Sequence, residues 1–253
     1  MRKVRIIARI DIKNEFAIKG IQFEGLRKVG NPNELAKRYY EAGIDEIIYM
    51  DAVASYYERN SLQDVVASTC ENIFVPITVG GGIRTVEDIQ QMLLAGADKV
   101  AINSQAIKTP DFIQKAAQIY GSQCIVGSVE AKKVAEGRWE AYIENGREPT
   151  GIDVVEWVKK LECLGAGEIL LTSVDKDGTK KGCDLELIDS IQKTCSLPLI
   201  VAGGVGKLAD TRDAAQYSGV DAICVASMLH YGMESIDNIK KEIAQIDNVE
   251  VRC

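Results

Sequence analysis

Three short motifs recur along the chain at an almost constant spacing, and this repeat constrains the fold more than any other feature. The paired motifs begin at Arg9 and Ser128, at Gly81 and Gly203, and at Asp98 and Asp221, which are 119, 122 and 123 residues apart. A constant offset over separate motifs implies that one structural unit occurs twice. We therefore expect two similar halves, at about residues 1–121 and 122–253.

Short β-rich runs alternate with longer helical patterns, which is typical of parallel βα units. Helix starts are predicted at Asn31-Pro32, Thr85, Thr109-Pro110 and Thr150–Asp153. Eight strands are predicted, at Val4–Ile10, Glu46–Asp51, Pro76–Val79, Lys99–Asn103, Gln123–Glu130, Glu168–Ser173, Pro198–Ala202 and Asp221–Ala226. With 253 residues, the chain has the length of an eight-fold α/β barrel. The prediction is an α/β fold, a single (β/α)8 TIM barrel over residues 1–253 built from two half-barrels.

Two acidic residues end equivalent strands of the two halves, Asp11 on strand 1 and Glu130 on strand 5. In an eight-strand ring these strands lie on opposite walls, at the end where barrel enzymes carry their active sites. Opposed carboxylates can act as general acid and base when their environments separate their pKa values. The alternative is that each carboxylate pairs with a nearby lysine, Lys13 or Lys132.

Two glycine pairs follow equivalent strands and are typical of phosphate-binding loops. Gly81-Gly82 follows strand 3 and Gly203-Gly204 follows strand 7. Glycine lets backbone N–H groups approach an anion, and the next helix N-terminus favours negative charge. Asn103-Ser104 and Ala226-Ser227 close strands 4 and 8 and can add hydroxyl hydrogen bonds. The alternative is that the glycines only permit tight turns. Further polar candidates at the mouth are Lys19, Asp51 and Asp177.

A second charged set lies at the starts of strands, and therefore at the opposite end of the barrel. Its members are Arg5, Glu46, Lys99 and Glu168. Charges on this face usually form stabilising salt bridges. Two cations and two anions around the barrel axis can also form a gate.

Composition excludes several classes of function. The net charge of −7 argues against a general nucleic-acid footprint. No apolar run approaches the length of a membrane span, and the N-terminal segment does not have the pattern of a signal peptide. The seven cysteines are scattered without a CxxC pair, and His230 is the single histidine. We expect buried thiols in a reducing cytoplasm, no metal site and no cofactor.

These residues together resemble the synthase (cyclase) subunit of imidazole glycerol phosphate synthase, over essentially the whole chain. The motifs that carry the resemblance are Lys19-Gly20, Asp51, Thr78-Val-Gly-Gly-Gly-Ile, Ala95-Gly-Ala-Asp-Lys-Val, Ile102-Asn-Ser, Gly121-Ser-Gln-Cys, Arg147-Glu-Pro-Thr-Gly, Gly165-Ala-Gly-Glu-Ile-Leu-Leu-Thr-Ser and Asp175-Lys-Asp-Gly-Thr-Lys.

The resemblance implies a lyase of a glutamine amidotransferase complex in histidine biosynthesis. A glutaminase subunit, forming a heterodimer with the barrel, would release ammonia that crosses to a bis-phosphorylated ribulosyl-aminoimidazole nucleotide. The products would be imidazole glycerol phosphate and an aminoimidazole carboxamide ribotide. The implied catalytic pair is Asp11 and Glu130. The implied substrate and phosphate contacts are Lys19, Asp51, Gly82, Asn103, Ser104, Thr172, Asp177, Gly178, Gly204 and Ser227. The implied ammonia gate and partner-facing residues are Arg5, Glu46, Lys99, Glu168 and Asp98.

The sequence departs from the family pattern at the substrate end. Glu130 stands where the family has aspartate, and Arg9 and Ala202 stand where it usually has cysteine and serine. A carboxylate moved by roughly an ångström can cost about 10²-fold in rate. The alternatives are therefore a divergent paralogue that channels ammonia for acetamidino-sugar formation in surface polysaccharide (O-antigen), a non-catalytic scaffold that activates a glutaminase, and a sugar-phosphate isomerase.

Overall fold

The computed structural model describes residues 1–52 and 62–252, and its centre is a closed ring of parallel strands. The eight ring strands, in their order around the barrel, are β1 (Arg2–Lys13), β4 (Glu46–Asp51), β5 (Ile77–Gly80), β6 (Lys99–Ile102), β7 (Ile125–Ala135), β10 (Glu168–Ser173), β11 (Leu199–Ala202) and β12 (Val220–Val225). The ring closes because β12 pairs in parallel with β1. The predicted (β/α)8 barrel is therefore confirmed.

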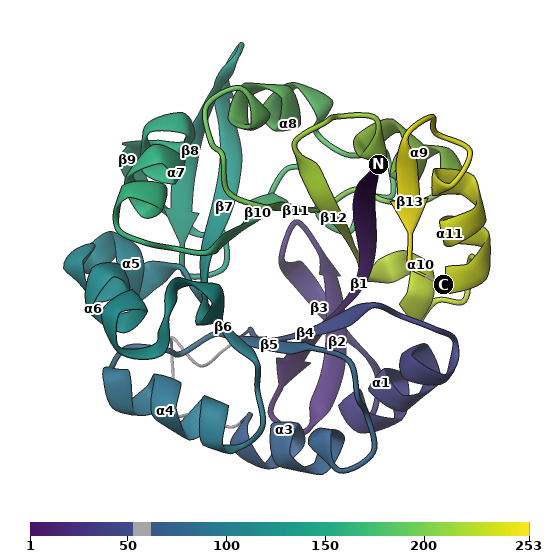
Figure 1. Ribbon diagram of the computed structural model, residues 1–253, viewed down its shortest axis with the longest axis horizontal. Helices are drawn as coiled ribbons and strands as arrows, with labels where there is room; N and C mark the ends of the chain where they lie inside the picture. Colours follow the sequence, from purple (N-terminus) through teal and green to yellow (C-terminus); the bar gives the residue numbers. More distant parts are fainter. Residues whose placement is uncertain (53–61, 253) are drawn as a thin grey trace.

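Helices surround the ring on its outer side (Figure 1). In the described part of the chain they are α1 (Pro32–Glu41), α3 (Gln63–Cys70), α4 (Val86–Leu94), α5 (Ser104–Lys108), α6 (Asp111–Tyr120), α7 (Val154–Cys163), α8 (Leu185–Gln192), α9 (Leu208–Ala215), α10 (Ser227–His230) and α11 (Ile236–Ile243), with a 3-10 turn at Ser122–Cys124. Within these ranges, no helix is both long enough and apolar enough to cross a membrane.

Side chains alternate between the two faces of each ring strand, so the barrel has two apolar cores. Ile6 and Ile47 belong to the larger core between the strands and the helices. Ile7, Ile48 and Leu170 belong to a separate buried cluster, which fills the lumen. The two cores explain why the ring strands are apolar on both faces.

Three of the four predicted helix starts show side-chain capping, whereas at Thr109-Pro110 the helix α6 begins after Pro110 without a side-chain cap. The side chain of Asn31 accepts hydrogen bonds from the backbone N–H groups of two residues in the first turn of α1. Thr85 forms a capping box with Asp88 at α4. Within the predicted start Thr150–Asp153, Asp153 caps α7, while the Thr150 hydroxyl donates to the carbonyl of Ala141. Thr150 therefore belongs to a strand and not to the helix.

Each half also carries an antiparallel hairpin that the sequence patterns did not predict. In the first half, β2 (Phe16–Ile21) and β3 (Glu24–Gly30) follow β1, and in the second half β8 (Arg138–Ile143) and β9 (Glu148–Asp153) follow β7. A short last strand, β13 (Val249–Val251), pairs with the start of β1. The hairpins occupy equivalent places, so the repeat extends beyond the three motifs that first revealed it.

Aspartates at the starts of ring strands hold the bottom of the barrel together. A carboxylate oxygen of Asp45 accepts a hydrogen bond from Ile6 N at 2.7 Å. Asp98 does the same for Ile77 N at 2.8 Å, and Asp221 for Leu199 N at 3.0 Å. Each aspartate therefore joins its own strand to the preceding one, using an N–H group that the ladder leaves available.

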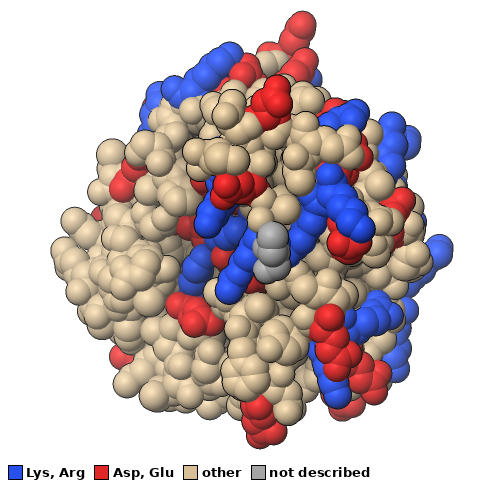
Figure 2. Space-filling model, turned by 45° about the vertical axis from the view of Figure 1, so that its right-hand side comes forward, with Lys and Arg blue, Asp and Glu red and all other residues tan. Residues whose placement is uncertain are grey.

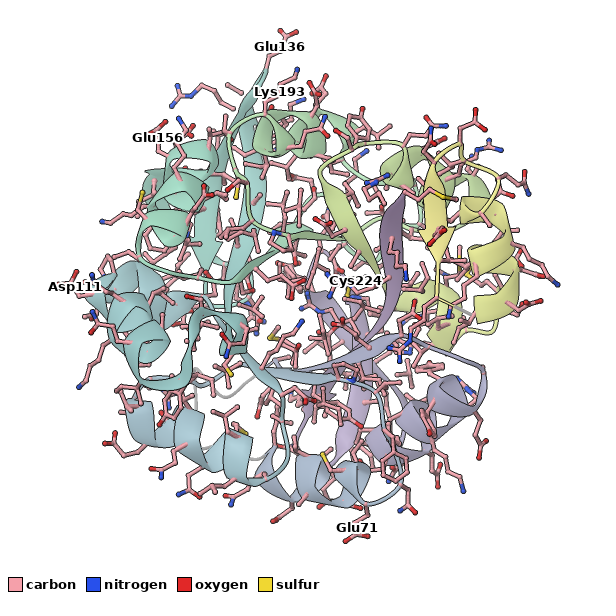
Figure 3. The ribbon with its side chains drawn as sticks, in the orientation of Figure 1. Glu71, Asp111, Glu136, Glu156, Lys193 and Cys224 are labelled. Carbon is pink, nitrogen blue, oxygen red and sulfur yellow. The ribbon has the colours of Figure 1, made fainter. Side chains whose placement is uncertain are left out.

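The cysteines differ from the expectation of buried thiols. All six described cysteines are free, but only Cys224 is buried, Cys163 is exposed, and the other four are intermediate. Cys253 lies outside the described residues. Figure 3 shows Cys224 near the middle of the barrel, whereas the labelled Glu71, Asp111, Glu136, Glu156 and Lys193 lie at its outer edge. The scattered spacing of the cysteines thus agreed with free thiols, but it did not predict how far each thiol is buried.

Candidate active site

The candidate site residues of strand β1 share one face of that strand and point into the lumen. Arg5, Ile7, Arg9 and Asp11 are alternate residues, and Ile7 belongs to the lumen cluster. Arg5 lies at the bottom, Ile7 in the apolar middle, and Arg9 and Asp11 at the mouth. One strand therefore lines the barrel axis from end to end.

Asp11 is held by two cations. Its Oδ1 accepts a hydrogen bond from Arg9 Nε at 2.7 Å, and its Oδ2 lies 3.3 Å from Lys19 Nζ. The same lysine, carried by hairpin strand β2, donates to both carboxylate oxygens of Asp177 at 2.8 and 2.9 Å. All four charged side chains are buried. Charged groups removed from water are stable only when paired in this way.

The two cations decide the protonation state of Asp11. Burial alone raises the pKa of this carboxyl, but the charges of Arg9 and Lys19 outweigh burial and bring the pKa down to about 2. Asp11 is therefore ionised at neutral pH.

Glu130 lies at the mouth end of the lumen face of β7. Its surroundings raise its pKa, whereas those of Asp11 lower the pKa of that carboxyl. Its Oε2 accepts a hydrogen bond from Gly146 N at 2.7 Å, in the turn between β8 and β9. Burial raises the pKa of Glu130 to about 7, against the lowering effects of this hydrogen bond and of the charge of Arg9. A carboxyl group with this pKa can hold or release a proton at neutral pH.

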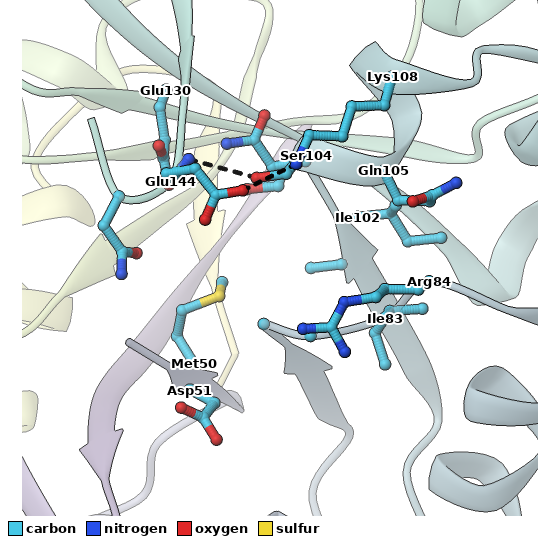
Figure 4. Close-up of a pocket in the computed structure, with 16 residues that line it drawn as sticks. Met50, Asp51, Ile83, Arg84, Ile102, Ser104, Gln105, Lys108, Glu130 and Glu144 are labelled. Atoms are coloured by element: carbon cyan, nitrogen blue, oxygen red, sulfur yellow. Dashed lines mark hydrogen bonds and ion pairs between the residues drawn. The ribbon is translucent and has the colours of Figure 1, made fainter. Parts of the chain in front are cut away.

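A cavity of about 110 Å³ contains Glu130 and the first glycine pair. Gly81 and Gly82 both have left-handed φ angles, of 90° and 75°. Asp51, Asn103 and Ser104 line the same cavity. The predicted first-half residues thus come together in one place (Figure 4).

The turn between β8 and β9 also enters this cavity, and sequence reasoning missed it. Glu144 carries a carboxylate there, which pairs with Lys108 Nζ at 3.1 Å, while its backbone N–H donates to Ser104 Oγ at 3.3 Å. The dipeptide Asn145-Gly146 is a typical hairpin-turn signal and could have located this turn.

The second glycine pair lines a much smaller cavity, of about 20 Å³. Gly203 and Gly204 have φ angles of 99° and 98°, so their backbone repeats the conformation of the first pair. The other lining residues include Arg9, Lys19, Asp177, Gly178 and Ser227. Thr172 lies beside these residues, and its hydroxyl oxygen accepts a hydrogen bond from Arg9 Nη1 at 3.3 Å.

The order of the strands fixes how these parts face one another. β1 and β7, which carry Asp11 and Glu130, are four strands apart in the ring of eight, and so are β5 and β11, which precede the glycine pairs. The carboxylates therefore oppose each other across the mouth, and the glycine pairs oppose each other along a crossing direction. A cavity of about 380 Å³ beside Asp11 adjoins the Glu130 cavity at Asn145, which lines both.

The four charged residues at the strand starts form a closed ring of ion pairs at the bottom. Arg5 contacts Glu46 at 2.6 Å and Glu168 at 2.5 Å. Lys99 contacts the same two carboxylates at 3.5 and 2.8 Å. Asp98 is exposed next to the ring. Figure 2 shows Lys and Arg side chains intermingled with Asp and Glu side chains near the middle of one face of the molecule.

A closed barrel with opposed carboxylates at the carboxyl ends of its strands defines the class of (β/α)8-barrel enzymes. Residues 5–235 match the family model described as histidine biosynthesis protein. The chain is also 58% identical over 208 residues to the imidazole glycerol phosphate synthase subunit HisF of Legionella pneumophila, covering 82% of this chain and 98% of that relative. The chain therefore belongs to the histidine biosynthesis protein family.

Proposed function

We propose that the protein is the cyclase (lyase) subunit of an imidazole glycerol phosphate synthase. It would use ammonia on a ribulosyl-aminoimidazole nucleotide that carries a phosphate at each end. The observation that carries this proposal is the crossed arrangement at the mouth. Two glycine pairs oppose each other along one direction, and two carboxylates of different pKa oppose each other along the other.

This arrangement suits a long ligand with two anionic ends. The phosphates would bind at Gly82, Asn103 and Ser104 at one end and at Gly204, Gly178 and Ser227 at the other. The middle of the ligand, where bonds change, would then lie between Asp11 and Glu130. Lys19, Asp51, Thr172 and Asp177 would line the remaining contacts.

The separation of the two pKa values assigns the roles of the carboxylates. Glu130, with a pKa of about 7, would donate a proton to the leaving nitrogen as general acid. Asp11, which stays ionised, would accept a proton from the attacking ammonia or stabilise positive charge that develops on it. Two equivalent positions of the repeat would thus have complementary functions.

The bottom ring supports the proposed source of ammonia. Arg5, Glu46, Lys99 and Glu168 close the end of the lumen opposite the site, and an apolar layer separates them from the mouth. A glutaminase subunit would dock at this end, near Asp98, and form a heterodimer with the barrel in the cytoplasm. Neutral ammonia crosses an apolar lumen at a lower cost than ammonium, because burying an isolated charge is costly.

The relative's identity favours this activity over the acetamidino-sugar alternative, because that relative is named as a subunit of imidazole glycerol phosphate synthase. The test supplies the purified chain with the ribulosyl nucleotide and a high concentration of ammonium, without any glutaminase. We expect formation of both products at an ordinary enzymatic rate. Absence of turnover by a folded chain would reject the proposal, and an E130Q variant would show the background rate.

A further inference from the structure

Arg9 is the buried cation whose place in the barrel is least explained by the fold. It lies on the lumen face of β1, between the apolar layer that contains Ile7 and the carboxylate of Asp11. Only 4% of its surface is exposed. A guanidinium in this position requires partners. Among the described residues it forms an ion pair with Asp11, donates a hydrogen bond to Thr172, and lies with its central carbon 5.5 Å from the centre of the Phe23 ring.

These contacts place Arg9 at the start of a chain of alternating charges. Arg9 binds Asp11, Asp11 binds Lys19, and Lys19 binds Asp177. Both oxygens of Asp11 are engaged in this chain. Both carboxylate oxygens therefore already contact protein cations, and a substrate must compete with Arg9 and Lys19 for Asp11.

Three of these four ion-paired side chains also narrow the cavity at the second glycine pair. Arg9, Lys19 and Asp177 all line it, and its volume of about 20 Å³ compares with about 110 Å³ at the first glycine pair. A volume of roughly 15 Å³ is what one water molecule requires. A phosphate group has four oxygens and is larger than one water molecule, and movement of the charged side chains that line the cavity would give it room.

Arg9 is well suited to such a rearrangement because it contacts Asp11 and also lines the cavity where a phosphate would bind. A phosphate carries roughly −1.5 to −2 charges at pH 7, against −1 for a carboxylate. The guanidinium presents several N–H donors in a planar fork, which matches phosphate geometry. A phosphate at Gly204 and Ser227 is thus a stronger partner for Arg9 than Asp11 is.

We propose that Arg9 is a positioning residue that exchanges Asp11 for the phosphate bound at Gly203–Gly204 and Ser227, so that filling this site releases Asp11 toward the substrate. The inference rests on the proposed function and extends it, because it makes the state of one carboxylate depend on occupancy of one phosphate site. A ligand without a phosphate at that end would find Asp11 still bound.

The first test measures binding of inorganic phosphate by calorimetry, without substrate or ammonium. R9M keeps an unbranched apolar side chain at this position but removes the guanidinium and its charge. We expect its phosphate affinity at the second site to fall by about 10- to 100-fold, which is the usual effect of losing a hydrogen bond between charged groups. R138M, which removes an exposed arginine of β8, is the matched control and should bind phosphate as the unaltered chain does.

Conservative replacement separates a charge-specific role from a packing role. R9K retains the positive charge and should recover affinity to within about 10-fold of the unaltered chain, because lysine binds phosphate as a point charge. Should R9M fail to fold, R9Q carries the test, because it also removes the charge but keeps polar groups that can bond Asp11 and Thr172. Equal phosphate affinity in the unaltered chain and in a folded R9M, or no phosphate binding by the unaltered chain, would overturn the inference.

The exchange itself is visible in crystals grown with inorganic phosphate. We expect phosphate at Gly204 and Ser227 with Arg9 bound to it and withdrawn from Asp11. Phosphate in that place with the Arg9–Asp11 pair intact would overturn the exchange. Neither measurement requires turnover. A chain that binds phosphate through Arg9 but does not convert the nucleotide would therefore reject the proposed function and leave this inference standing.

Discussion

Asp11 and Glu130 occupy the same position in the two halves of the barrel, yet Asp11 is held between two cations whereas Glu130 accepts a hydrogen bond from the backbone of Gly146. Repetition thus supplies two carboxylates on opposite walls, and their different neighbours make them chemically different. Arg9 and Lys19 keep Asp11 ionised, while burial raises the pKa of Glu130 to about 7. This asymmetry permits acid and base chemistry in one symmetric scaffold.

Replacing Glu130 tests this division of roles. If protonated Glu130 is the general acid, kcat should fall as pH rises above about 7, because the group loses its proton there. E130Q should lower kcat by about 10²- to 10⁴-fold and abolish the decline above pH 7. The measurement is a pH profile of ammonium-driven turnover. A kcat that rises through pH 7 would assign the opposite role to Glu130.

The ring at the bottom makes a different prediction, because it lies far from the carboxylates along the same axis. K99M removes one of the two cations that hold Glu46 and Glu168. In the complex with a glutaminase, we expect glutamine-driven turnover to fall by about 10-fold or more, on the order of one lost charged hydrogen bond, while ammonium-driven turnover stays unchanged. K193M, at the outer edge of the barrel, is the control. Equal losses with both nitrogen sources would show that the ring has only a structural role.

The sequence predicted the ring of strands well because the pattern behind it is strong. Glu46–Asp51 and Glu168–Ser173 agree with β4 and β10 to the residue, since apolar runs bounded by turn residues define strands buried on both faces. The hairpins were missed because one strand of each, β3 and β9, is polar and largely exposed, and because the turn at Gln22 and Phe23 uses non-glycine residues in the left-handed region.

The site could be predicted only in part, for a related reason. Repeat spacing located the carboxylates and glycine pairs, which lie at ends of ring strands. It could not show that Lys19 reaches Asp177, because that contact joins residues 158 positions apart through an unpredicted hairpin. Glu144 was missed in the same way, because it lies in the turn of the other hairpin. Contacts made by loops folding over the mouth depend on tertiary structure and leave no periodic signal.

The aspartates at the barrel bottom predict a graded effect on stability. Asp45 is buried and also pairs with Lys240 Nζ at 2.8 Å, whereas Asp98 is exposed. D45A leaves the backbone N–H of Ile6 without its acceptor and removes the ion pair of Lys240, and should cost about 3 kcal/mol in the free energy of unfolding. D98A should cost about 1 kcal/mol, because water can replace the lost hydrogen bond. Urea titrations of both variants provide the comparison, and equal costs would contradict the argument from burial.

His230 should make stability depend on pH at mildly acidic values. Its ring is buried, its Nδ1 lies 2.7 Å from the Tyr39 hydroxyl, and its Nε2 has no hydrogen-bond partner among the described residues. Burial lowers the pKa of His230 to about 4, from an ordinary value of 6.5. The unfolded chain therefore binds a proton between pH 6.5 and 4 where the folded chain does not.

This difference gives the sign and size of the effect. The contribution of neutral His230 is complete above pH 6.5 and is lost as pH falls toward 4, by about 3 kcal/mol in total. Glu130 acts in the opposite sense over an overlapping range, since its raised pKa favours the folded state at lower pH. The informative quantity is therefore the difference in unfolding free energy between the unaltered chain and H230Q, measured by urea titration at pH 7 and pH 5, because Glu130 contributes equally to both. From pH 7 to pH 5 the unaltered chain should lose more unfolding free energy than H230Q does. A difference independent of pH would show that the imidazole titrates normally in the folded protein.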